Sequence, residues 1–256
     1  MSSHTARYPS LAGRSVFVTG GGSGIGASIV SMFAEQDAKV AFIDIAEGPS
    51  RALADSIAAQ GRPKPWWRTC DVKDVPALQA AIRDAAGVRG DFHVLVNNVA
   101  NDDRHPLDSV TPEYYDERIA VNQRAALFAL QAVVPGMKRL GFGSIVNIGS
   151  NSWRMKNGDM PCYTVAKSSM SGLTRGTATP LGKHRIRVNT VMPGWVMTER
   201  QKALWLTSEG EKEIERNQCL PDRVQPEDIA AMVLWLGSDD SHMCSAQEFT
   251  VDGGWT

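Results

Sequence analysis

The stretch S-V-F-V-T-G-G-G-S-G-I-G, residues 15–26, decides the fold of this chain. Its first five residues are apolar or β-branched and predict a short buried strand. The glycines that follow predict a tight turn. Beyond the turn, apolar side chains recur with a helical period at Ile25, Ile29, Val30, Phe33 and Ala34. The stretch therefore predicts a strand, a glycine turn and a helix in direct succession.

This turn is suited to binding a dinucleotide. Glycines allow the backbone to approach a ligand closely, and a helix N-terminus offers free N–H groups and a positive dipole end to a pyrophosphate. The alternative is a glycine-rich turn without a ligand, but the strand–turn–helix context favours binding. The expected cofactor contacts here are Gly20, Ser23, Gly24, Ile25 and Gly26.

An acidic residue follows the second predicted strand. Val40–Ile43 is apolar and ends at Asp44, about 20 residues beyond the turn. A carboxylate there can accept both ribose hydroxyls of an adenosine and repels a 2′-phosphate. No Lys or Arg lies in the turn or directly after Asp44, so the sequence favours NAD over NADP. Asp44 could also be the N-cap of a helix predicted at 49–60, and both roles are compatible.

Further short apolar segments alternate with helical ones. Strands are predicted at 66–70, 92–96, 144–148, 187–191 and 249–251. Such alternation implies crossover connections and a parallel sheet. We therefore expect an α/β fold, a doubly wound parallel sheet of Rossmann type in three α/β/α layers, forming a single domain over residues 1–256. Ligands bind beyond the carboxyl ends of such strands, where Asp71, Val72, Asn98 and Ser150 lie.

Tyr163 and Lys167 are four residues apart in a segment, 163–181, of helical length, so they share one helix face. A free phenol has a pKa of about 10, and a fixed ammonium nearby lowers the pKa of a phenol. The hydroxyl of Ser150 can hold the oxygen of an alcohol or carbonyl. The alternative, an amphipathic helix start with a chance tyrosine, is disfavoured by the dinucleotide signals elsewhere in the chain.

Composition excludes several classes. The net charge is -1 without a long basic run, which disfavours nucleic-acid binding. No apolar run reaches the ~20 residues of a membrane span, and the polar Met1–Pro9 segment predicts a loose tail rather than a signal peptide. The scattered histidines and cysteines predict no metal site and reduced thiols in a cytoplasmic protein. The cysteines are Cys70, Cys162, Cys219 and Cys244.

These motifs together resemble the short-chain dehydrogenase/reductase family over nearly the whole chain. The family's glycine motif corresponds to residues 19–26, and its Pro-Gly motif at the nicotinamide to 193–194. The resemblance implies cofactor contacts from Pro193, Val196 and Thr198 and from the catalytic Tyr and Lys. It implies a catalytic set of Asn122, Ser150, Tyr163 and Lys167.

One departure from the family lies in its Asn motif. The motif appears as Asn97-Asn98 but continues as Val99-Ala100, where the family usually has Ala-Gly. The two substitutions add side-chain bulk near the cofactor.

Within the family, the chain looks most like the bacterial D-xylose 1-dehydrogenases and related NAD-linked aldose dehydrogenases. The similar stretches are residues 101–105, 116–119, 149–153, 218–220 and 238–240. The resemblance implies that Tyr163 takes a proton from the anomeric hydroxyl while hydride passes to NAD, giving the aldonolactone. It assigns Lys167 to lower the Tyr163 pKa and bind the nicotinamide ribose, and Asn122 to position a water.

Substrate contacts are expected around the end of this site. A sugar site needs several polar groups and an apolar or aromatic wall. The candidates are Asn101, Ser150, Asn151, Ser152, Trp153, Tyr163, Trp195, Gln201 and Trp205. Trp153 and Trp205 could instead be packing residues, and Asp102 with Arg104 could form a surface ion pair worth about 0–1 kcal/mol. Residues 199–217 are predicted to form a two-helix lid.

Two other functions are weighed against this one. Another enzyme of the family could act on a hydroxy, keto or 3-oxoacyl substrate, but biosynthetic reductases usually use NADPH, which Asp44 disfavours. A non-catalytic dinucleotide sensor would tend to lose the Tyr–Lys pair, which is present here. A homotetramer is expected, mainly from the resemblance and partly because residues 125–134 and 232–236 are more apolar than one core-facing helix side requires.

Overall fold

A computed structural model describes residues 6–156 and 158–256, so most of the N-terminal tail predicted at 1–9 lies outside the described residues. Seven strands form one sheet in the order β3-β2-β1-β4-β5-β6-β7, and all neighbours pair in parallel. The strands are β1 (Ser15–Thr19), β2 (Lys39–Asp44), β3 (Trp66–Thr69), β4 (Val94–Asn97), β5 (Gly143–Ile148), β6 (Ile186–Pro193) and β7 (Glu248–Val251).

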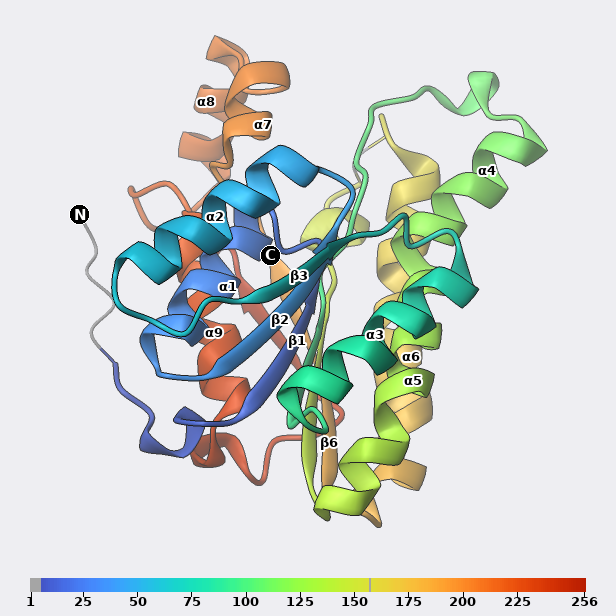
Figure 1. Cartoon of the computed structure of the whole chain (residues 1–256). Helices are drawn as coiled ribbons and strands as arrows, with labels where there is room; N and C mark the ends of the chain where they lie inside the picture. Colours follow the sequence, from blue (N-terminus) through green and yellow to red (C-terminus); the bar gives the residue numbers. More distant parts are fainter. Residues whose placement is uncertain (1–5, 157) are drawn as a thin grey trace.

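Helices cover both faces of the sheet, which confirms the predicted doubly wound α/β fold (Figure 1). One face packs against α1 (Gly24–Glu35), α2 (Glu47–Ala59) and α9 (Pro226–Gly237). The other packs against α3 (Val75–Arg89), α5 (Ala125–Leu140) and α6 (Pro161–Gly182). Beyond the carboxyl ends of the strands lie α4 (Pro112–Ile119), α7 (Glu199–Leu204) and α8 (Ser208–Asn217).

Strand β1, one of the inner strands of the sheet, shows why helices cover both faces. All residues of β1 are buried. Val16 and Val18 belong to the core under α1 and α9, whereas Phe17 belongs to the core under α3 and α5. Successive strand residues point to opposite faces, so an apolar strand needs cover on both sides. Burying each such side chain contributes about 1.5–3 kcal/mol.

Two local features differ from the sequence prediction. Helix α2 begins at Glu47 with Ala46 as its N-cap, so Asp44 is not the cap. Pro49 falls within the first turn, where its missing N–H costs nothing. Asn122 lies in a π-helical turn, Ala120–Arg124, between α4 and α5. Such turns re-aim a side chain within a continuous helix and occur mostly at functional sites.

The order in which strands are added to the sheet reverses between β1 and β4, which are neighbours in the sheet. The residues at this switch point are tightly packed. The Asn98 side-chain amide donates to the carbonyl oxygens of Thr19 (3.1 Å) and Gly20 (2.8 Å). A Cβ on Gly26 would lie 1.8 Å from the Gly20 oxygen, so only glycine fits there. The first turn of α1 is thereby pressed against the end of β1.

A buried hydrogen-bonded relay fixes α6 on the sheet. Asn97 of β4 donates to Asn147 of β5, and Asn147 donates to the Thr174 hydroxyl of α6, each at 2.9 Å. The hydroxyls of Thr174 and Thr190 of β6 are 2.8 Å apart. All four side chains are buried. Unmade hydrogen bonds are costly in such a place, so the relay specifies the position of α6.

We predict that Thr174→Val lowers the free energy of unfolding by about 1–3 kcal/mol, because it leaves buried polar partners of Thr174 unsatisfied. Thr177→Val is the matched control, since the Thr177 hydroxyl bonds the Leu173 carbonyl of its own helix at 2.7 Å. Urea unfolding of both variants measures the difference. Equal losses in the two variants would show that the relay does not hold α6.

Candidate active site

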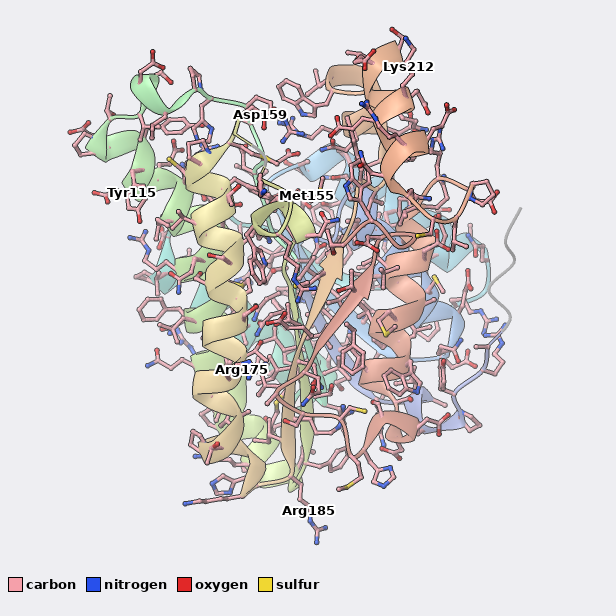
Figure 2. The ribbon with its side chains drawn as sticks, turned by 180° about the vertical axis from the view of Figure 1, so that it is seen from behind. Tyr115, Met155, Asp159, Arg175, Arg185 and Lys212 are labelled. Atoms are coloured by element: carbon pink, nitrogen blue, oxygen red, sulfur yellow. The ribbon has the colours of Figure 1, made fainter. Side chains whose placement is uncertain are left out.

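A cavity of about 970 Å³ opens at the carboxyl edge of the sheet. Figure 2 shows Met155 and Asp159 at this end of the molecule, which also carries α8, and Arg185 at the opposite end. The predicted cofactor residues all line this cavity: Gly20, Ser23, Gly24, Ile25, Gly26, Asp44, Asp71, Val72, Asn98, Tyr163, Lys167, Pro193, Val196 and Thr198. The predicted substrate residues that line it are Asn101, Ser150, Asn151, Ser152, Tyr163, Trp195, Gln201 and Trp205.

Trp153 does not line the cavity. It ends the 3₁₀ turn Asn151–Trp153, of which the first two residues are buried, whereas Trp153 is 38% exposed. The Arg154 guanidinium lies 5.0 Å from its ring centroid, on the outside of the protein. The structure therefore corrects the prediction that Trp153 contacts the substrate: a one-residue step along a helical turn rotates a side chain by about 100–120°.

Asn122 lies behind the cavity wall, against the loop that follows β4. Its side-chain oxygen accepts a hydrogen bond from the Asn101 amide at 2.7 Å, and its nitrogen donates to the Asn101 carbonyl at 3.1 Å. Asn122 thus holds both polar groups of one backbone residue. Because Asn101 begins the loop that enters the cavity, this clamp positions the loop.

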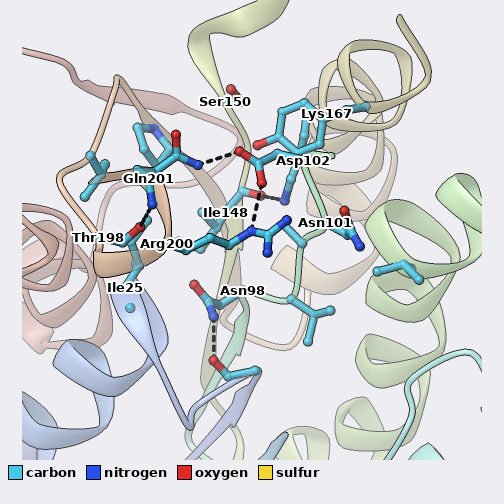
Figure 3. A pocket seen from close by; sticks show the side chains of 18 of the residues that line it. Ile25, Asn98, Asn101, Asp102, Ile148, Ser150, Lys167, Thr198, Arg200 and Gln201 are labelled. Carbon is cyan, nitrogen blue, oxygen red and sulfur yellow. Dashed lines mark hydrogen bonds and ion pairs between the residues drawn. The ribbon is translucent and has the colours of Figure 1, made fainter. Parts of the chain in front are cut away.

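Lys167 is almost completely buried, with 2% of its surface exposed. Its ammonium donates to the Ile148 carbonyl at 2.7 Å (Figure 3). Burial lowers the pKa of Lys167 from 10.5 to about 8, although the nearby Asp102 carboxylate favours the charged form. The ammonium lies 6.0 Å from the centroid of the Tyr163 ring, on the same helix face as predicted.

The pKa of Tyr163 differs from the sequence prediction. Burial raises this pKa above its ordinary value of 10, and the Asp102 carboxylate raises it further. A hydrogen bond from Ser150 and the charge of Arg104 act in the opposite direction but do not prevail. The predicted net lowering by Lys167 is therefore wrong for the protein without ligands, because desolvation of the phenolate dominates. In the protein without ligands, the Tyr163 phenol therefore keeps its proton at neutral pH.

Two buried polar atoms at one end of the cavity have no partner in the described structure. They are the Ser152 hydroxyl and the Trp205 indole nitrogen. Ser152 is 3% exposed. A buried donor without a partner costs about 1–3 kcal/mol, and both residues line the cavity. They are suited to hydrogen-bond a polar ligand.

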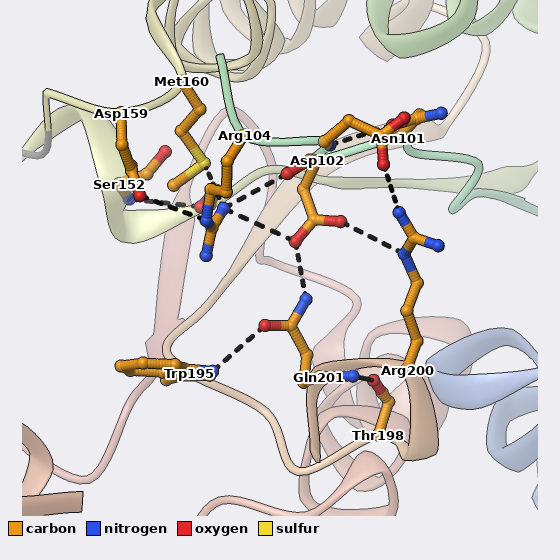
Figure 4. Close-up of polar contacts among 12 residues, drawn as sticks. Asn101, Asp102, Arg104, Ser152, Asp159, Met160, Trp195, Thr198, Arg200 and Gln201 are labelled. Atoms are coloured by element: carbon orange, nitrogen blue, oxygen red, sulfur yellow. Dashed lines mark hydrogen bonds and ion pairs between the residues drawn. The ribbon is translucent and has the colours of Figure 1, made fainter. Parts of the chain in front are cut away.

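A charged cluster surrounds this end (Figure 4). Arg104 lies 3.6 Å from Asp102 and 3.2 Å from Asp159, and its guanidinium lies 5.1 Å from the Trp205 ring centroid. The side chains of Asp102 and Arg104 are only 18% and 20% exposed and line the cavity. The interpretation of Asp102 and Arg104 as a surface ion pair is therefore wrong. The loop after β4 turns inward at Asp102, directly after Asn101, which Asn122 holds in place.

The segment predicted as a lid forms the two helices α7 and α8. Gln201 of α7 accepts from the Trp195 indole at 3.0 Å and donates to Asp102 at 2.5 Å. Arg200 reaches Asp102 at 3.5 Å and also pairs with Asp103. Sequence reasoning did not identify Arg200 or Asp159 as part of this site. A signal was present for Arg200, which lies two residues after Thr198 in the predicted lid.

The residues at the other end of the cavity fit a dinucleotide. Ser23, the N-cap of α1, makes no side-chain capping bond, so the first-turn N–H groups of α1 remain for a phosphate. Asp44 accepts from the amides of Gly22 (2.8 Å) and Ala46 (2.9 Å), one bond to each oxygen, and keeps capacity for ribose hydroxyls. Ile45 is 70% exposed and offers an apolar wall beside Asp44.

Val99, the departure from the family motif, packs on the glycine turn. Its Cγ2 atom lies 2.9 Å from where a Cβ on Gly20 would be. Val99 therefore adds its bulk to the wall beneath the turn and still leaves the cavity open.

The described residues contain no group of three or more His, Cys, Asp or Glu placed to hold a metal ion. No helix in the described part of the chain is long and apolar enough to cross a membrane.

We predict a pH signature of the buried Lys167. Between pH 8 and 10.5 the unfolded chain holds the Lys167 proton and the folded protein has released it, so the free energy of unfolding rises with pH in that window. Lys167→Met removes this rise. Denaturant unfolding of both proteins at several pH values measures it, with Tyr163 present in each. A stability difference that stays constant from pH 8 to 10.5 would contradict the burial of a titrating ammonium.

Comparisons with known proteins find dehydrogenases and reductases that are similar to this chain. A family model described as enoyl-(acyl carrier protein) reductase matches residues 20–256. D-xylose 1-dehydrogenase of Caulobacter vibrioides is 48% identical over 98% of this chain and 99% of its own length. The probable galactose dehydrogenase GalD of Rhizobium meliloti is 44% identical over 99% of both chains. The solved structure of a 7α-hydroxysteroid dehydrogenase with NADH and 7-oxo glycochenodeoxycholic acid has a TM-score of 0.91 and 30% identity, covering 96% of this chain and 95% of that one.

Proposed function

Because this chain belongs to the short-chain dehydrogenase/reductase family of oxidoreductases, we propose that it is an NAD-dependent aldose 1-dehydrogenase. It oxidises C1 of an aldopentose, D-xylose or L-arabinose ahead of hexoses, to the aldonolactone. The names of the two sugar dehydrogenases that it resembles support the substrate class.

One observation carries the proposal: the cavity end beside Tyr163 combines unpaired buried donors with a carboxylate. The donors are Ser152 and Trp205, and the carboxylate is that of Asp102. A hydroxyl group donates and accepts hydrogen bonds at once, so a sugar needs both kinds of partner side by side. A ketone or thioester carbonyl only accepts and would leave the carboxylate unmatched.

The chemistry follows from the positions of the catalytic side chains. Ser150 donates to the substrate oxygen, and Tyr163 takes the proton from the anomeric hydroxyl. Lys167, held by the Ile148 carbonyl, places a positive charge near the phenolate as it forms, and this attraction is strong where water is excluded. When bound, NAD supplies the hydride acceptor and the positive charge of its nicotinamide ring. Asn122 contributes by fixing the loop that carries Asn101.

The remaining assignments belong to the same proposal. Thr198 and Val196 contact the nicotinamide amide, with α7 and α8 closing over the bound substrate as a lid.

We assign the protein to the cytoplasm, where its four free thiols stay reduced. We also assign it to a homotetramer, supported by exposed apolar side chains such as Leu127 on α5 and Val165 on α6. A monomeric mass in light scattering at micromolar concentration would contradict the assembly.

We predict that the wild-type protein reduces NAD with D-xylose or L-arabinose and that Tyr163→Phe abolishes turnover while NAD binding stays nearly unchanged. The screen includes D-glucose, L-rhamnose, L-fucose, a steroid, a simple alcohol and, in the reverse direction, an acetoacetyl thioester. Initial rates and NAD titration by fluorescence are measured. Turnover of the steroid or thioester without any aldose would refute the substrate class. More than a few per cent of kcat in the variant would refute Tyr163 as the base.

We predict that Asp44→Ala weakens NAD binding and narrows the preference for NAD over NADP. The carboxylate that receives the ribose hydroxyls and repels a 2′-phosphate is lost, and so are its bonds to Gly22 and Ala46. Glu47→Ala, an exposed change at the start of α2, is the control. Dissociation constants for both dinucleotides are compared. An unchanged ratio in Asp44→Ala would limit Asp44 to a structural role in the turn.

A further inference from the structure

We propose that Asp102 accepts a hydrogen bond from the sugar hydroxyl on the carbon next to the one oxidised, and thereby selects polyhydroxylated substrates. This inference rests on the proposed function and adds a residue that recognises a hydroxyl group of the substrate. Asp102 belongs to neither the catalytic set nor the cofactor motif.

The position of Asp102 places its carboxylate beside the reacting group. It lies on the loop after β4, lines the same cavity as Tyr163, and points into that cavity beside Ser150 and Lys167 (Figure 3). The negative charge raises the pKa values of both Tyr163 and Lys167. Because Asp102 and Tyr163 line the same cavity, a substrate bound at Tyr163 occupies the space that the carboxylate faces.

The carboxylate has acceptor capacity to spare. Among the described residues, one hydrogen bond reaches its side chain, from Gln201 at 2.5 Å. The guanidinium groups of Arg104 and Arg200 lie farther away, at 3.6 and 3.5 Å. An ionised carboxylate offers about four acceptor positions. Hydroxyl donors of a ligand can use those that remain.

The carboxylate is also held in place before any ligand binds. Gln201 is fixed by the Trp195 indole, and Arg104 is fixed by Asp159 and the Met160 sulfur. These partners come from three separate segments of the chain (Figure 4). An acceptor that is already oriented loses little conformational entropy when a ligand binds. It can therefore bind one particular hydroxyl group selectively.

The neighbours of Asp102 complete the pattern that a hydroxyl requires. Arg104 and Trp205 line the same cavity and carry N–H donors, which can bond a hydroxyl oxygen while Asp102 accepts the hydroxyl hydrogen. A substrate without that hydroxyl leaves a partly buried carboxylate without its partner. Sites built to bond a hydroxyl reject analogues that lack it far more strongly than apolar pockets reject a methylene.

The test is a cycle that combines an enzyme variant with a substrate analogue. Asp102→Asn keeps the size of the side chain and removes its charge. The kcat/KM values of wild type and variant are measured for D-xylose and 2-deoxy-D-xylose. Each single change is expected to lower kcat/KM by about 10- to 100-fold, and both together by no more than either alone. Asp108→Asn, an exposed change later in the same loop, should leave all values unchanged.

Additive losses would overturn the proposal, because displacement of Gln201 or Arg104 alone would weaken both substrates equally. A binding measurement separates this failure from that of the proposed function. Calorimetry with the NAD-loaded Tyr163→Phe protein compares the affinities for D-xylose and its 2-deoxy analogue, with and without Asp102→Asn. If wild type oxidises no aldose, the proposed function fails. The role of Asp102 then stands only if Asp102→Asn abolishes the preference for D-xylose over the analogue.

Discussion

The active-site region depends on keeping one ammonium ion out of water. Lys167 is buried, and a charge in such a place requires a partner at hydrogen-bond distance. The partner is the Ile148 carbonyl at the end of β5, so α6 must dock on the sheet at one level. The relay through Thr174 enforces the same level from deeper in the core. Two independent constraints on one helix explain how Tyr163 is aimed at the cavity without a bound ligand.

The end of the cavity around Asp102 is held together in a different way. Its charged and hydrogen-bonded residues come from the loop after β4, the segment before α6, and the segment from Trp195 to Gln201, which includes the start of α7. Side chains make these contacts, and one backbone bond, from the His105 amide to the Asp159 carbonyl (2.7 Å), also joins the first two segments. Gln201 joins them, because one amide bonds both Trp195 and Asp102. The pKa of Tyr163 is therefore set partly by Asp102, on the loop after β4.

The sequence predicted the parallel sheet, the glycine turn and the polar strand ends, because strand period and glycine placement are local signals. It did not predict the direction of the Tyr163 pKa shift, because burial of a phenol depends on residues distant in the chain. The inward turn of Asp102 and Arg104 was also missed, since it depends on a clamp by Asn122 about twenty positions later. Trp153 was misplaced because neighbouring positions in a short helical turn differ in direction, and the sequence does not show which one faces inward.

The separation of Tyr163 and Lys167 from the loops around Asp102 has a consequence for divergence within the family. Tyr163 and Lys167 are anchored by the interior, whereas Asp102 and Gln201 are supported by partly buried segments beyond the carboxyl ends of the strands. Under the proposed function, mutations in those segments would alter ligand selectivity at little cost to global stability and would leave Tyr163 and Lys167 in place. A scaffold of this kind can accumulate new specificities one loop at a time, which also makes these loops the natural targets for directed evolution.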